Sequence, residues 1–394
     1  MRIAAFISHP IQYFTPLWQQ LSVTPDVHLT VFYYSRQGLD ASFDPGFDKT
    51  MAWDMDLLAG HAFEFLPRQW PTRDPLDYSA TGLNSHIVAT LRRGWDVAFV
   101  SGYSHINNWV VLSACKALGI PLLLYADSNL NGDIHKPQWK RATKRTLLLP
   151  FISNVAAFLA PGDQTRRYFV AYGARPESVF ISPFVVDVGG FRQAVESAGE
   201  RGRHALRERF TIPNGNRVVA FGGKFVPWKR PLDLVRAVEK LARDDVTVLF
   251  IGDGPLRDEV ARANSDLIRI TGFLNRSEIP VALGLTDILV LPSEIEPFGI
   301  IVSEAQALGI PCIVSDRCGC HGPDSVLQDG YSGFVYPCGD LQALSLRVGQ
   351  LLDDVALYER MSCAARKQGD LQSPFHAAAG FIAAAKHAVD RQRR

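Results

Sequence analysis

The sequence predicts an α/β protein with two domains in tandem, each built on a parallel sheet with helices on both faces. The first observation is the length of 394 residues, which leaves room for two domains. The second is that short apolar runs alternate with helical stretches along the whole chain. The third is that these runs are apolar throughout, as expected of strands that are buried on both faces.

The predicted strands and helices follow this alternation in both halves of the chain. The strands of the first half are residues 2–7, 28–33, 97–100, 121–125 and 155–159. Those of the second half are residues 217–221, 247–251, 267–270, 287–291 and 311–314. Predicted helices between them include residues 79–92, 107–118, 231–242, 256–263 and 300–308. Such β–α arrays predict two Rossmann-like domains, and ligands of these domains bind beyond the carboxyl ends of the strands.

The domain boundary is expected between residues 184 and 217. This stretch holds Gly189-Gly190, a charged run at 200–209 and the turn Pro213-Asn214-Gly215, after which a new strand begins. We therefore predict an N-terminal domain over residues 1–200, a C-terminal domain over 201–370, and a last helix over 371–394 that packs back on the N-terminal domain. The two domains are expected to face a cleft.

The composition excludes several classes of protein. Hydrophobic residues make up 47% and charged residues 21% of the chain, as in a folded globular protein. The net charge of +1 gives no overall field that favours nucleic acid, so we expect no nucleic-acid partner. The N-terminus lacks a signal-peptide pattern, so the six cysteines are expected to be free thiols in the cytoplasm. Cys318-Gly319-Cys320 and His321 lack the spacing of a zinc site, and we expect no metal.

The loop after the predicted strand 217–221 is rich in glycine and cations. It contains Gly222-Gly223, Lys224 and Lys229, and Pro231 suits the first turn of the next helix. Lysines at a strand end beside a helix N-terminus favour an anion site, most naturally for a diphosphate. The alternative is a solvated basic loop.

A second turn, Gly252-Asp253-Gly254-Pro255, follows the predicted strand 247–251. It leads into a helix that has proline at its start. The two glycines either let the backbone approach a ligand or simply let the helix pack on the strand.

The third segment carries two carboxylates eight residues apart, Glu296 and Glu304. Pro297 and Gly299 break the chain before a helix, and Glu304 lies on that helix in an apolar stretch. A buried carboxylate needs a partner, and vicinal ribose hydroxyls are suitable donors. Glu296 is placed to meet sugar hydroxyls, with the amides of Phe298 and Gly299 at the helix N-terminus. The alternative makes Glu296 a surface acid and Glu304 a charge near a helix start.

Over about residues 215–370, the sequence resembles the large family of retaining glycosyltransferases called family 4 or group 1, which have the GT-B fold. The motifs that carry the resemblance are Gly223-Lys224 with Lys229-Arg230, Gly252-Asp253-Gly254-Pro255, Glu296 with Glu304, residues 305–311 and residues 329–334. The first half matches more loosely, through residues 97–100 and 183–187.

The resemblance implies a nucleoside diphosphate sugar as donor and a role for each matched residue. Lys224 and Lys229 would hold the diphosphate, and Glu304 the ribose. Glu296 would hold the donor sugar together with the amides that follow it. The segment 271–274 would contact the base through its backbone. The complete set of predicted donor-binding residues is Lys224, Lys229, Gly223, Gly252, Gly254, Phe273, Leu274, Phe298, Gly299 and Glu304.

Two departures from the family pattern occur in the lysine loop. Lys224 replaces the usual arginine, which keeps the charge but loses bidentate geometry. Arg230 replaces a glycine after Lys229, which is expected to bring an extra cation near the phosphates.

The N-terminal half departs further. Asp127 lies about where family members often carry a histidine near the donor sugar, and the Gly-Gly loop after the first strand is replaced by a segment that begins at Ser8-His9-Pro10. Tyr103 and His105 follow another predicted strand. We assign Glu296, Asp127 and His105 as catalytic candidates, and His9 and Tyr103 to the acceptor side. For each histidine the alternative is a packed or surface residue.

The segment 135–149 is basic and amphipathic. It holds five Lys or Arg residues and Trp139, followed by Leu147-Leu148-Leu149. One interpretation is that this segment contacts anionic lipid head groups or a lipid-linked acceptor. The alternative is a solvated helix face.

The sequence therefore predicts a metal-independent glycosyltransferase of the hexosyltransferase kind that needs no cofactor. It would transfer a sugar with retention to a hydroxyl acceptor, in surface polysaccharide or glycolipid biosynthesis. The acceptor would be a polysaccharide or lipid-linked, and the protein cytoplasmic, either free or peripheral at the inner face of the membrane. The alternatives are a nucleotide-sugar epimerase-hydrolase of the same fold and a non-catalytic nucleotide-sugar-binding partner subunit.

Overall fold

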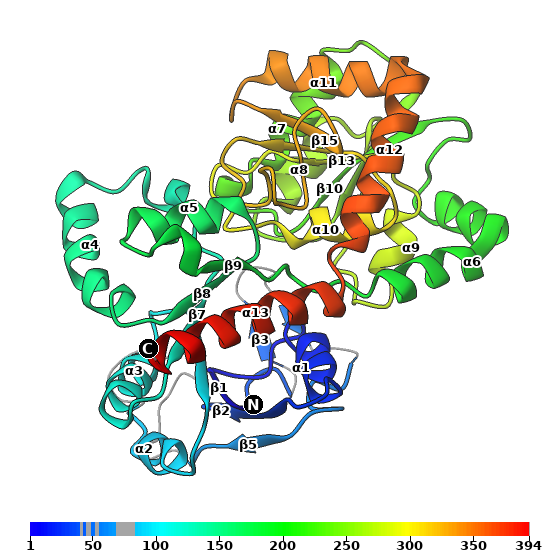
Figure 1. Ribbon diagram of the computed structural model, residues 1–394. Coiled ribbons are helices and arrows are strands. Elements are labelled where there is room, and N and C mark those ends of the chain that lie inside the picture. The colour runs from blue at the N-terminus through cyan, green and yellow to red at the C-terminus, as the bar shows by residue number, and fades with distance from the viewer. Residues whose placement is uncertain (40–41, 45–48, 52–54, 68–82, 394) are drawn as a thin grey trace. The chain divides into compact units, whose positions relative to one another are not determined.

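A computed structural model of the protein describes residues 1–39, 42–44, 49–51, 55–67 and 83–393. The chain divides into two compact units. Unit 1 comprises residues 1–42, 55–185 and 374–394, and unit 2 comprises residues 43–54 and 186–373. Each unit has its own parallel sheet covered by helices, which confirms the predicted fold class (Figure 1).

Unit 1 contains a seven-stranded sheet in the order β5-β2-β1-β6-β7-β8-β9. Its neighbouring strands are parallel, with Ile3 of β1 opposite both Leu29 and Val97. The two three-residue strands β5 and β9 at the edges were not predicted, because a run of three residues shows no periodicity. The strands are β1 (Arg2–Ile7), β2 (His28–Tyr33), β5 (Phe63–Phe65), β6 (Val97–Ser101), β7 (Leu122–Tyr125), β8 (Ala157–Ala160) and β9 (Val179–Ile181).

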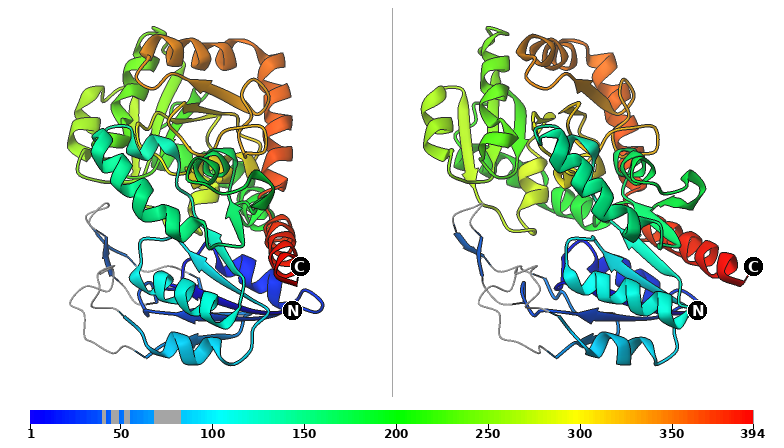
Figure 2. Two further views of the ribbon diagram at one scale, coloured as in Figure 1. Left: turned by 60° about the vertical axis from the view of Figure 1, so that its left-hand side comes forward. Right: turned by 90° about the vertical axis from the view of Figure 1, so that its left-hand side faces the viewer.

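Helices cover both faces of this sheet, as the two views of Figure 2 show. The helix predicted at 79–92 is described only as the shorter α2, and residues 79–82 lie outside the described residues. The helices of unit 1 are α1 (Thr15–Ser22), α2 (His86–Leu91), α3 (Ile106–Leu118), α4 (Gln138–Ile152), α5 (Asp163–Ala171) and α13 (Pro374–Arg393).

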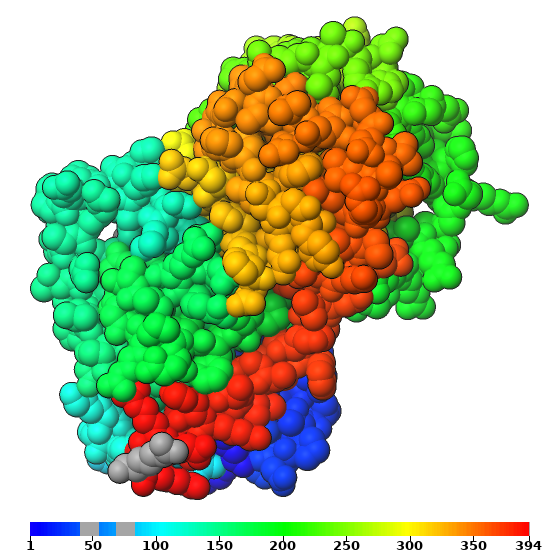
Figure 3. Space-filling view, turned by 45° about the horizontal axis from the view of Figure 1, so that its top comes forward, coloured from blue at the N-terminus to red at the C-terminus, as the bar shows by residue number. Residues whose placement is uncertain are grey.

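The helices α1 and α13 pack on one face. Trp18, Phe99 and Phe381 meet there with ring centroids 5.3–6.2 Å apart. Gly380 lets α13 approach the sheet closely, since a Cβ at this position would lie 1.9 Å from the carbonyl oxygen of Ile181. The last helix therefore packs back on the N-terminal part of the chain, as predicted; Figure 3 shows it (red) beside α1 (blue).

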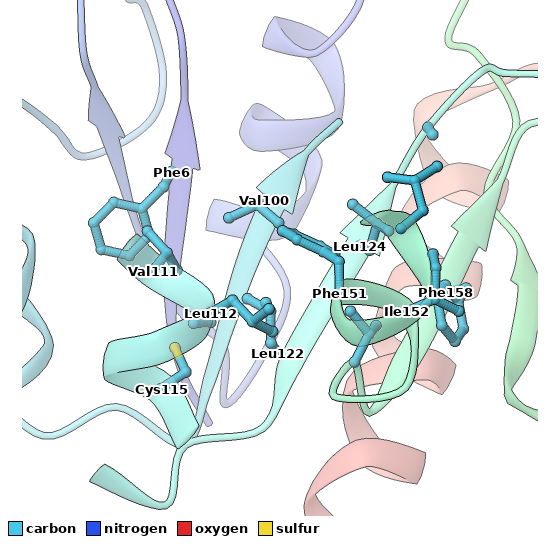
Figure 4. Packing of buried hydrophobic residues seen from close by; sticks show 14 of the residues in the cluster. Phe6, Val100, Val111, Leu112, Cys115, Leu122, Leu124, Phe151, Ile152 and Phe158 are labelled. Atoms are coloured by element: carbon cyan, nitrogen blue, oxygen red, sulfur yellow. The ribbon is translucent and has the colours of Figure 1, made fainter. Parts of the chain in front are cut away.

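The other face carries the main hydrophobic core of unit 1. In Figure 4, side chains from the strands (Phe6, Leu124) meet Val111 of α3 and Phe151 at the end of α4. All four are fully buried. This core holds the β1, β6 and β7 strands in place, and the loops that follow these strands carry the predicted N-terminal site residues.

Unit 2 has a six-stranded parallel sheet in the order β12-β11-β10-β13-β14-β15. The five strands predicted for the second half are present, and β15 was missed because it has only four residues, of which the first is Gly333. The strands are β10 (Arg217–Gly222), β11 (Val246–Ile251), β12 (Ile268–Gly272), β13 (Ile288–Leu291), β14 (Cys312–Ser315) and β15 (Gly333–Tyr336). A separate two-stranded sheet is formed by β3 (Ser42–Asp44) and β4 (Lys49–Met51).

The helices of unit 2 also lie on both faces of their sheet. The set α7, α8 and α11 packs on one face, and α6, α9, α10 and α12 pack together on the other. These helices are α6 (Val188–Arg209), α7 (Pro231–Glu239), α8 (Arg257–Ala263), α9 (Ile279–Leu283), α10 (Ile300–Ala307), α11 (Leu341–Asp353) and α12 (Val355–Asp370).

The stretch expected to hold the domain boundary contains a long helix. Residues 188–209 form α6, which begins where the Asp187 side chain accepts a hydrogen bond from the amide of Gly190. It packs against α9 and α10, so the units change over between Val185 and Val186 rather than at residue 200. The two glycines that suggested a linker lie in the first turn of α6.

Within the described residues, the helices are too short or too polar to cross a membrane.

Candidate functional site

Two loops of unit 2 meet beyond the carboxyl ends of adjacent strands. The loop after β10 ends in a short 3-10 helix, Pro227–Lys229, and the loop after β13 runs over residues 292–299. The carbonyl oxygen of Trp228 accepts hydrogen bonds from the amides of Glu294 and Ile295, at 2.8 and 3.3 Å. This pairing holds the lysine loop against the carboxylate loop.

The turn after β11 packs directly on the lysine loop. A Cβ at Gly252 would lie 2.0 Å from the carbonyl oxygen of Gly223, and one at Gly254 would lie 2.7 Å from the amide nitrogen of Phe225. Both glycines have positive φ, 141° and 152°. Close contact between two protein loops is therefore a sufficient reason for both glycines, in line with the packing interpretation of this turn.

The two predicted site residues Lys229 and Glu296 form an ion pair. The Lys229 ammonium contacts Oε2 of Glu296, and the exposed fractions of their side chains are 19% and 7%. The hydroxyl of Ser293 donates a hydrogen bond to the same oxygen at 3.4 Å. A diphosphate or sugar bound here would therefore contact both Lys229 and Glu296. Lys224 lies partly buried in the loop that carries Lys229.

Arg230 contacts two carboxylates of unit 2. Its backbone is left-handed, with φ 51° and ψ 46°, which fits a position where glycine is usual. The guanidinium forms an ion pair with Asp233 at 2.6 Å and lies 3.9 Å from Glu294. The hydrogen bond that Arg230 donates to Asp233 raises the pKa of Arg230, although partial burial acts in the opposite direction. This cation is held by carboxylates of its own unit.

The helix α10 begins beside Glu296. Gly299 precedes it with φ 97°, and a Cβ there would lie 2.6 Å from the side chain of Leu291. Ile301 of α10 packs closely on Gly222 at the end of β10, because a Cβ at Gly222 would lie only 2.7 Å from the Ile301 side chain. This contact fixes α10 over β10. The Phe298 side chain is buried, so it is the backbone of 298–299 that can face a ligand.

Glu304 lies one turn into α10 and is partly buried. Burial raises the pKa of its carboxyl to about 7, while the Arg276 guanidinium acts in the opposite direction. Among the described residues, none donates a hydrogen bond to this carboxylate. The site therefore contains a carboxylate that is desolvated and open to a donor.

The segment expected to contact a base, residues 271–274, ends two residues before Arg276, whose charge acts on Glu304. It includes the partly buried Phe273 and the buried Leu274. The carbonyl oxygen of Gly272 accepts a hydrogen bond from the amide of Gly252 at 3.1 Å, which joins this segment to the glycine turn. Arg276 was not among the predicted residues, although its position two residues after Leu274 is a signal that could have found it.

The cysteines near this site are free, and Cys318 and Cys320 are fully buried. Burial raises the pKa of both thiols. Within the described part of the chain, no three His, Cys, Asp or Glu side chains are grouped as metal ligands.

In unit 1, the predicted N-terminal residues follow three neighbouring strands. His9 follows β1, Tyr103 and His105 follow β6, and Asp127 follows β7. Because these strands are parallel neighbours, their loops lie at the same edge of the sheet. Asp127 is exposed there.

The individual roles of these residues differ. Burial lowers the pKa of His9, so its ring is neutral near pH 7, and its Nδ1 lies 2.9 Å from the Ser8 hydroxyl. His105 caps α3, where its Nδ1 accepts a hydrogen bond from the amide of Asn107 at 3.2 Å. Tyr103 lies 2.6 Å from the hydroxyl of Tyr168. His105 and Tyr103 therefore both have structural contacts that support the loop.

A cluster that the sequence did not single out lies beside Tyr103. Lys144 of α4 forms an ion pair with the buried Asp133 and lies over the rings of Tyr168 and Tyr172, 5.1 and 5.5 Å from their centroids. Burial alone would raise the pKa of Asp133, but the Lys136 and Lys144 ammonium groups outweigh it and lower that pKa. Residues distant in sequence meet here, so no local pattern could reveal the cluster.

Comparison with known proteins finds a family model that matches the part of the chain that contains the unit 2 site. Residues 202–368 match the family model described as Glycosyl transferases group 1. The sequence is 31% identical over 170 residues to an alpha-D-kanosaminyltransferase of Streptomyces kanamyceticus, covering 41% of this chain and 43% of that one. It is 28% identical over 235 residues to a D-inositol 3-phosphate glycosyltransferase of Kineococcus radiotolerans, covering 53% and 52%. The chain thus spans about half the length of the curated relatives it matches.

Solved structures share the whole fold. The structure of Anabaena Alr3699/HepE in complex with UDP has a TM-score of 0.71 and 17% identity, with 97% of this chain and 99% of that chain covered. The structure of WaaG, a glycosyltransferase involved in lipopolysaccharide biosynthesis, has a TM-score of 0.64 and 14% identity, with 97% and 98% covered. At these identities the likeness concerns the fold alone.

Proposed function

We propose that the protein transfers a sugar from a nucleoside diphosphate sugar to a hydroxyl, and the match of residues 202–368 to the model of group 1 glycosyl transferases supports this. The observation that carries the proposal is Glu304, a desolvated carboxylate on α10 that accepts no hydrogen bond from the described residues. A ribose supplies two hydroxyl donors to such a group.

The diphosphate would lie between the lysine loop and the start of α10. Lys229, Lys224 and the amides at 298–299 are positive groups in that part of unit 2. When the bond from the sugar to the diphosphate breaks, negative charge grows on the leaving group. Fixed cations that meet this charge stabilise the transition state.

The donor sugar would lie against Glu296. Glu296 is paired with Lys229, and its carboxylate oxygens can also accept hydrogen bonds from sugar hydroxyls. The reaction would proceed with retention, as the family resemblance implies. Asp127, His105, His9 and Tyr103 remain the candidates on the acceptor side, and His9 has the neutral ring that a proton acceptor requires.

No metal or cofactor enters this scheme, because the lysines carry the charge that a cation carries in other folds. Transfer activity should therefore survive treatment with EDTA. Activity that is lost to EDTA and restored by magnesium or manganese would contradict this part of the proposal.

The acceptor would be a polysaccharide or a lipid-linked saccharide, and the protein would act in the cytoplasm or at the inner face of the membrane. Surface polysaccharide or glycolipid biosynthesis is the process that fits such an acceptor.

The test of the donor site compares the affinities of UDP and 2′-deoxy-UDP for wild type and for Glu304→Gln. UDP is a suitable probe because a structure of the same fold contains it. Hydrogen bonds to a charged group contribute about 1.5–3 kcal/mol, so wild type should prefer UDP by roughly tenfold or more, and the variant should lose most of that preference. Should UDP fail to bind, GDP and ADP with their deoxy analogues provide the same comparison. If wild type binds both members of every pair equally well, Glu304 does not contact the ribose.

A second measurement separates transfer from its alternatives. Release of nucleotide from the donor is followed with and without an acceptor extract. Release that needs the acceptor supports transfer, whereas release without it supports an epimerase-hydrolase. Tight binding without turnover under either condition supports a non-catalytic binding subunit.

A further inference from the structure

The helix α4 is packed at its end and exposed over most of its length. Its buried residues are Leu148, Phe151 and Ile152, all in the last five positions. From Gln138 to Leu147, every residue is exposed except the half-buried Lys144. Figure 1 shows α4 at the outer side of unit 1, next to α5. Because α4 packs on unit 1 through its last turn and through Lys144, most of its surface is exposed.

The charge around α4 has a single sign. Residues 134–162 contain no Asp or Glu, and five Lys or Arg residues lie between positions 136 and 145. Two of these cations have a partner within the protein, because Lys136 and Lys144 both pair with the single carboxylate of Asp133. The exposed cations that remain on the helix are Lys140, Arg141 and Arg145.

The outward face of α4 is apolar. At about 100° per residue, Trp139, Thr143 and Thr146 project within roughly 60° of one another, opposite the buried residues. Both threonine hydroxyls donate to carbonyl oxygens of the preceding turn, at 2.9 and 3.1 Å, which leaves their methyl groups as the outer surface. Trp139 is 65% exposed, and the flanking Leu147 and Leu149 are 62% and 49% exposed.

Cations lie on both sides of this apolar stripe. Arg145 lies beyond Leu149 at one edge and Lys140 beyond Leu147 at the other, whereas Arg141 lies behind Arg145, roughly 160° from Trp139, on a part of the helix that is also exposed. An apolar stripe with a cationic border has the chemistry of a helix that lies in a membrane interface, where indole and leucine enter the acyl boundary and cations meet anionic head groups.

We propose that this docking face, formed by Trp139, Thr143, Thr146, Leu147 and Leu149 with Lys140, Arg141 and Arg145, binds the surface of an anionic lipid bilayer. The Asp133–Lys144 pair and its tyrosines fix α4 in the orientation that presents the face. Lys144 belongs to the support of the helix and contributes nothing to the lipid contact. The proposal does not depend on sugar transfer, since binding to lipid is measured without donor or acceptor.

The test is co-sedimentation of the full chain with phosphatidylglycerol-containing vesicles and with pure phosphatidylcholine vesicles. Wild type should bind the anionic vesicles alone, and added salt should weaken the binding. In the variant Lys140→Gln, Arg141→Gln, Arg145→Gln, three cations each contribute about 1 kcal/mol near such a surface, so binding should fall roughly a hundredfold. Melting temperatures of wild type and variant should agree, since these side chains are exposed.

The matched control removes three exposed cations from another helix. Arg201, Arg203 and Arg209 of α6 are exposed and have Glu200 and Glu208 near them, so their change to Gln alters the net charge equally and should leave vesicle binding intact. Equal loss in both triple variants would overturn the proposal, as would failure of wild type to bind anionic vesicles.

Insertion of the indole gives a second readout. Lipids brominated in the acyl chains should quench part of the fluorescence of wild type, and this part should be absent in Trp139→Phe. Concentration-dependent self-association that needs α4 and occurs without lipid would instead identify a second copy as the occupant. That result, or unquenched fluorescence in protein bound to vesicles, would overturn the proposal.

Discussion

Replacement of Glu304 by glutamine should stabilise the free protein at alkaline pH and leave it nearly unchanged at acidic pH. Burial raises the pKa of this carboxyl from 4.5 to about 7, so the folded state favours the protonated form. Ionisation of the buried group therefore costs folding free energy. Below the unfolded pKa near 4.5 the cost is absent, it grows as the pH rises, and it is complete above about 7.

The size of the cost follows from the shift of the pKa. Each pKa unit corresponds to about 1.4 kcal/mol, so a rise of this size corresponds to about 3 kcal/mol at most. Part of the Glu304 surface remains exposed, which reduces the expected value to roughly 1–3 kcal/mol. For a unit of this size, each kcal/mol shifts the melting temperature by about 2–4 °C. Glutamine carries no charge and avoids the cost at every pH.

The assay is thermal unfolding of wild type and Glu304→Gln at pH 5 and pH 8 without nucleotide. The variant should melt roughly 3–10 °C higher at pH 8 and within about 3 °C of wild type at pH 5. Comparison at the same pH cancels the titration of the other groups. An equal melting temperature at pH 8, or an equal gain at both pH values, would refute the idea that an ionised, unpartnered carboxylate lies here.

Three further perturbations test single contacts. Lys229→Ala removes the ionic partner of the nearly buried Glu296 and should cost about 1–3 kcal/mol of stability, measured by denaturant titration. The added change Glu296→Gln should restore most of this loss, whereas additive losses would argue against the pair. Arg230→Gly relieves a left-handed backbone worth about 1 kcal/mol but removes the nearest ionic partner of the buried Asp233, so the protein should lose roughly 1–3 kcal/mol of stability while UDP affinity changes by less than threefold. A large fall in affinity would place this cation at the phosphates. Asp133→Asn should destabilise unit 1 at pH 7, and the difference from wild type should shrink as the pH falls below the ordinary pKa of 3.8 towards the lowered pKa of Asp133. Scanning calorimetry at pH 7 and at a series of acidic pH values would show this, and a constant difference would mean that its charge is irrelevant.

The strands could be predicted where the chain is buried on both faces. β1 and β2 were predicted at their observed bounds, because five consecutive apolar or β-branched residues after a single polar one are a strong signal. β5, β9 and β15 are too short to give that signal, and whether these residues form strands depends on pairing with a neighbouring strand. The boundary is a similar case, since α6 packs on α9 and α10 through contacts distant in the sequence.

The predicted donor residues fall into two groups once their contacts are known. Lys229, Glu296 and Glu304 have positions that only ionic or ligand contacts explain. Gly252 and Gly254, in contrast, are required by the contact between the glycine turn and the lysine loop, which the local sequence cannot reveal. Motif spacing pointed to loops that the structure brings together, but it could not separate residues that can face a ligand from residues that let the loops meet.

The same limit explains Lys144. In the sequence it is one of five cations in a basic run, and residue type alone would assign it to the lipid or the solvent. Asp133 and three tyrosine rings from other elements draw it inward. A lysine can reach such a site because its long stem packs on aromatic rings while its ammonium meets the carboxylate. The charge that remains for an outside partner is therefore smaller than the sequence suggests, and it is concentrated on the two borders of an apolar stripe, where a flat anionic surface can meet both at once.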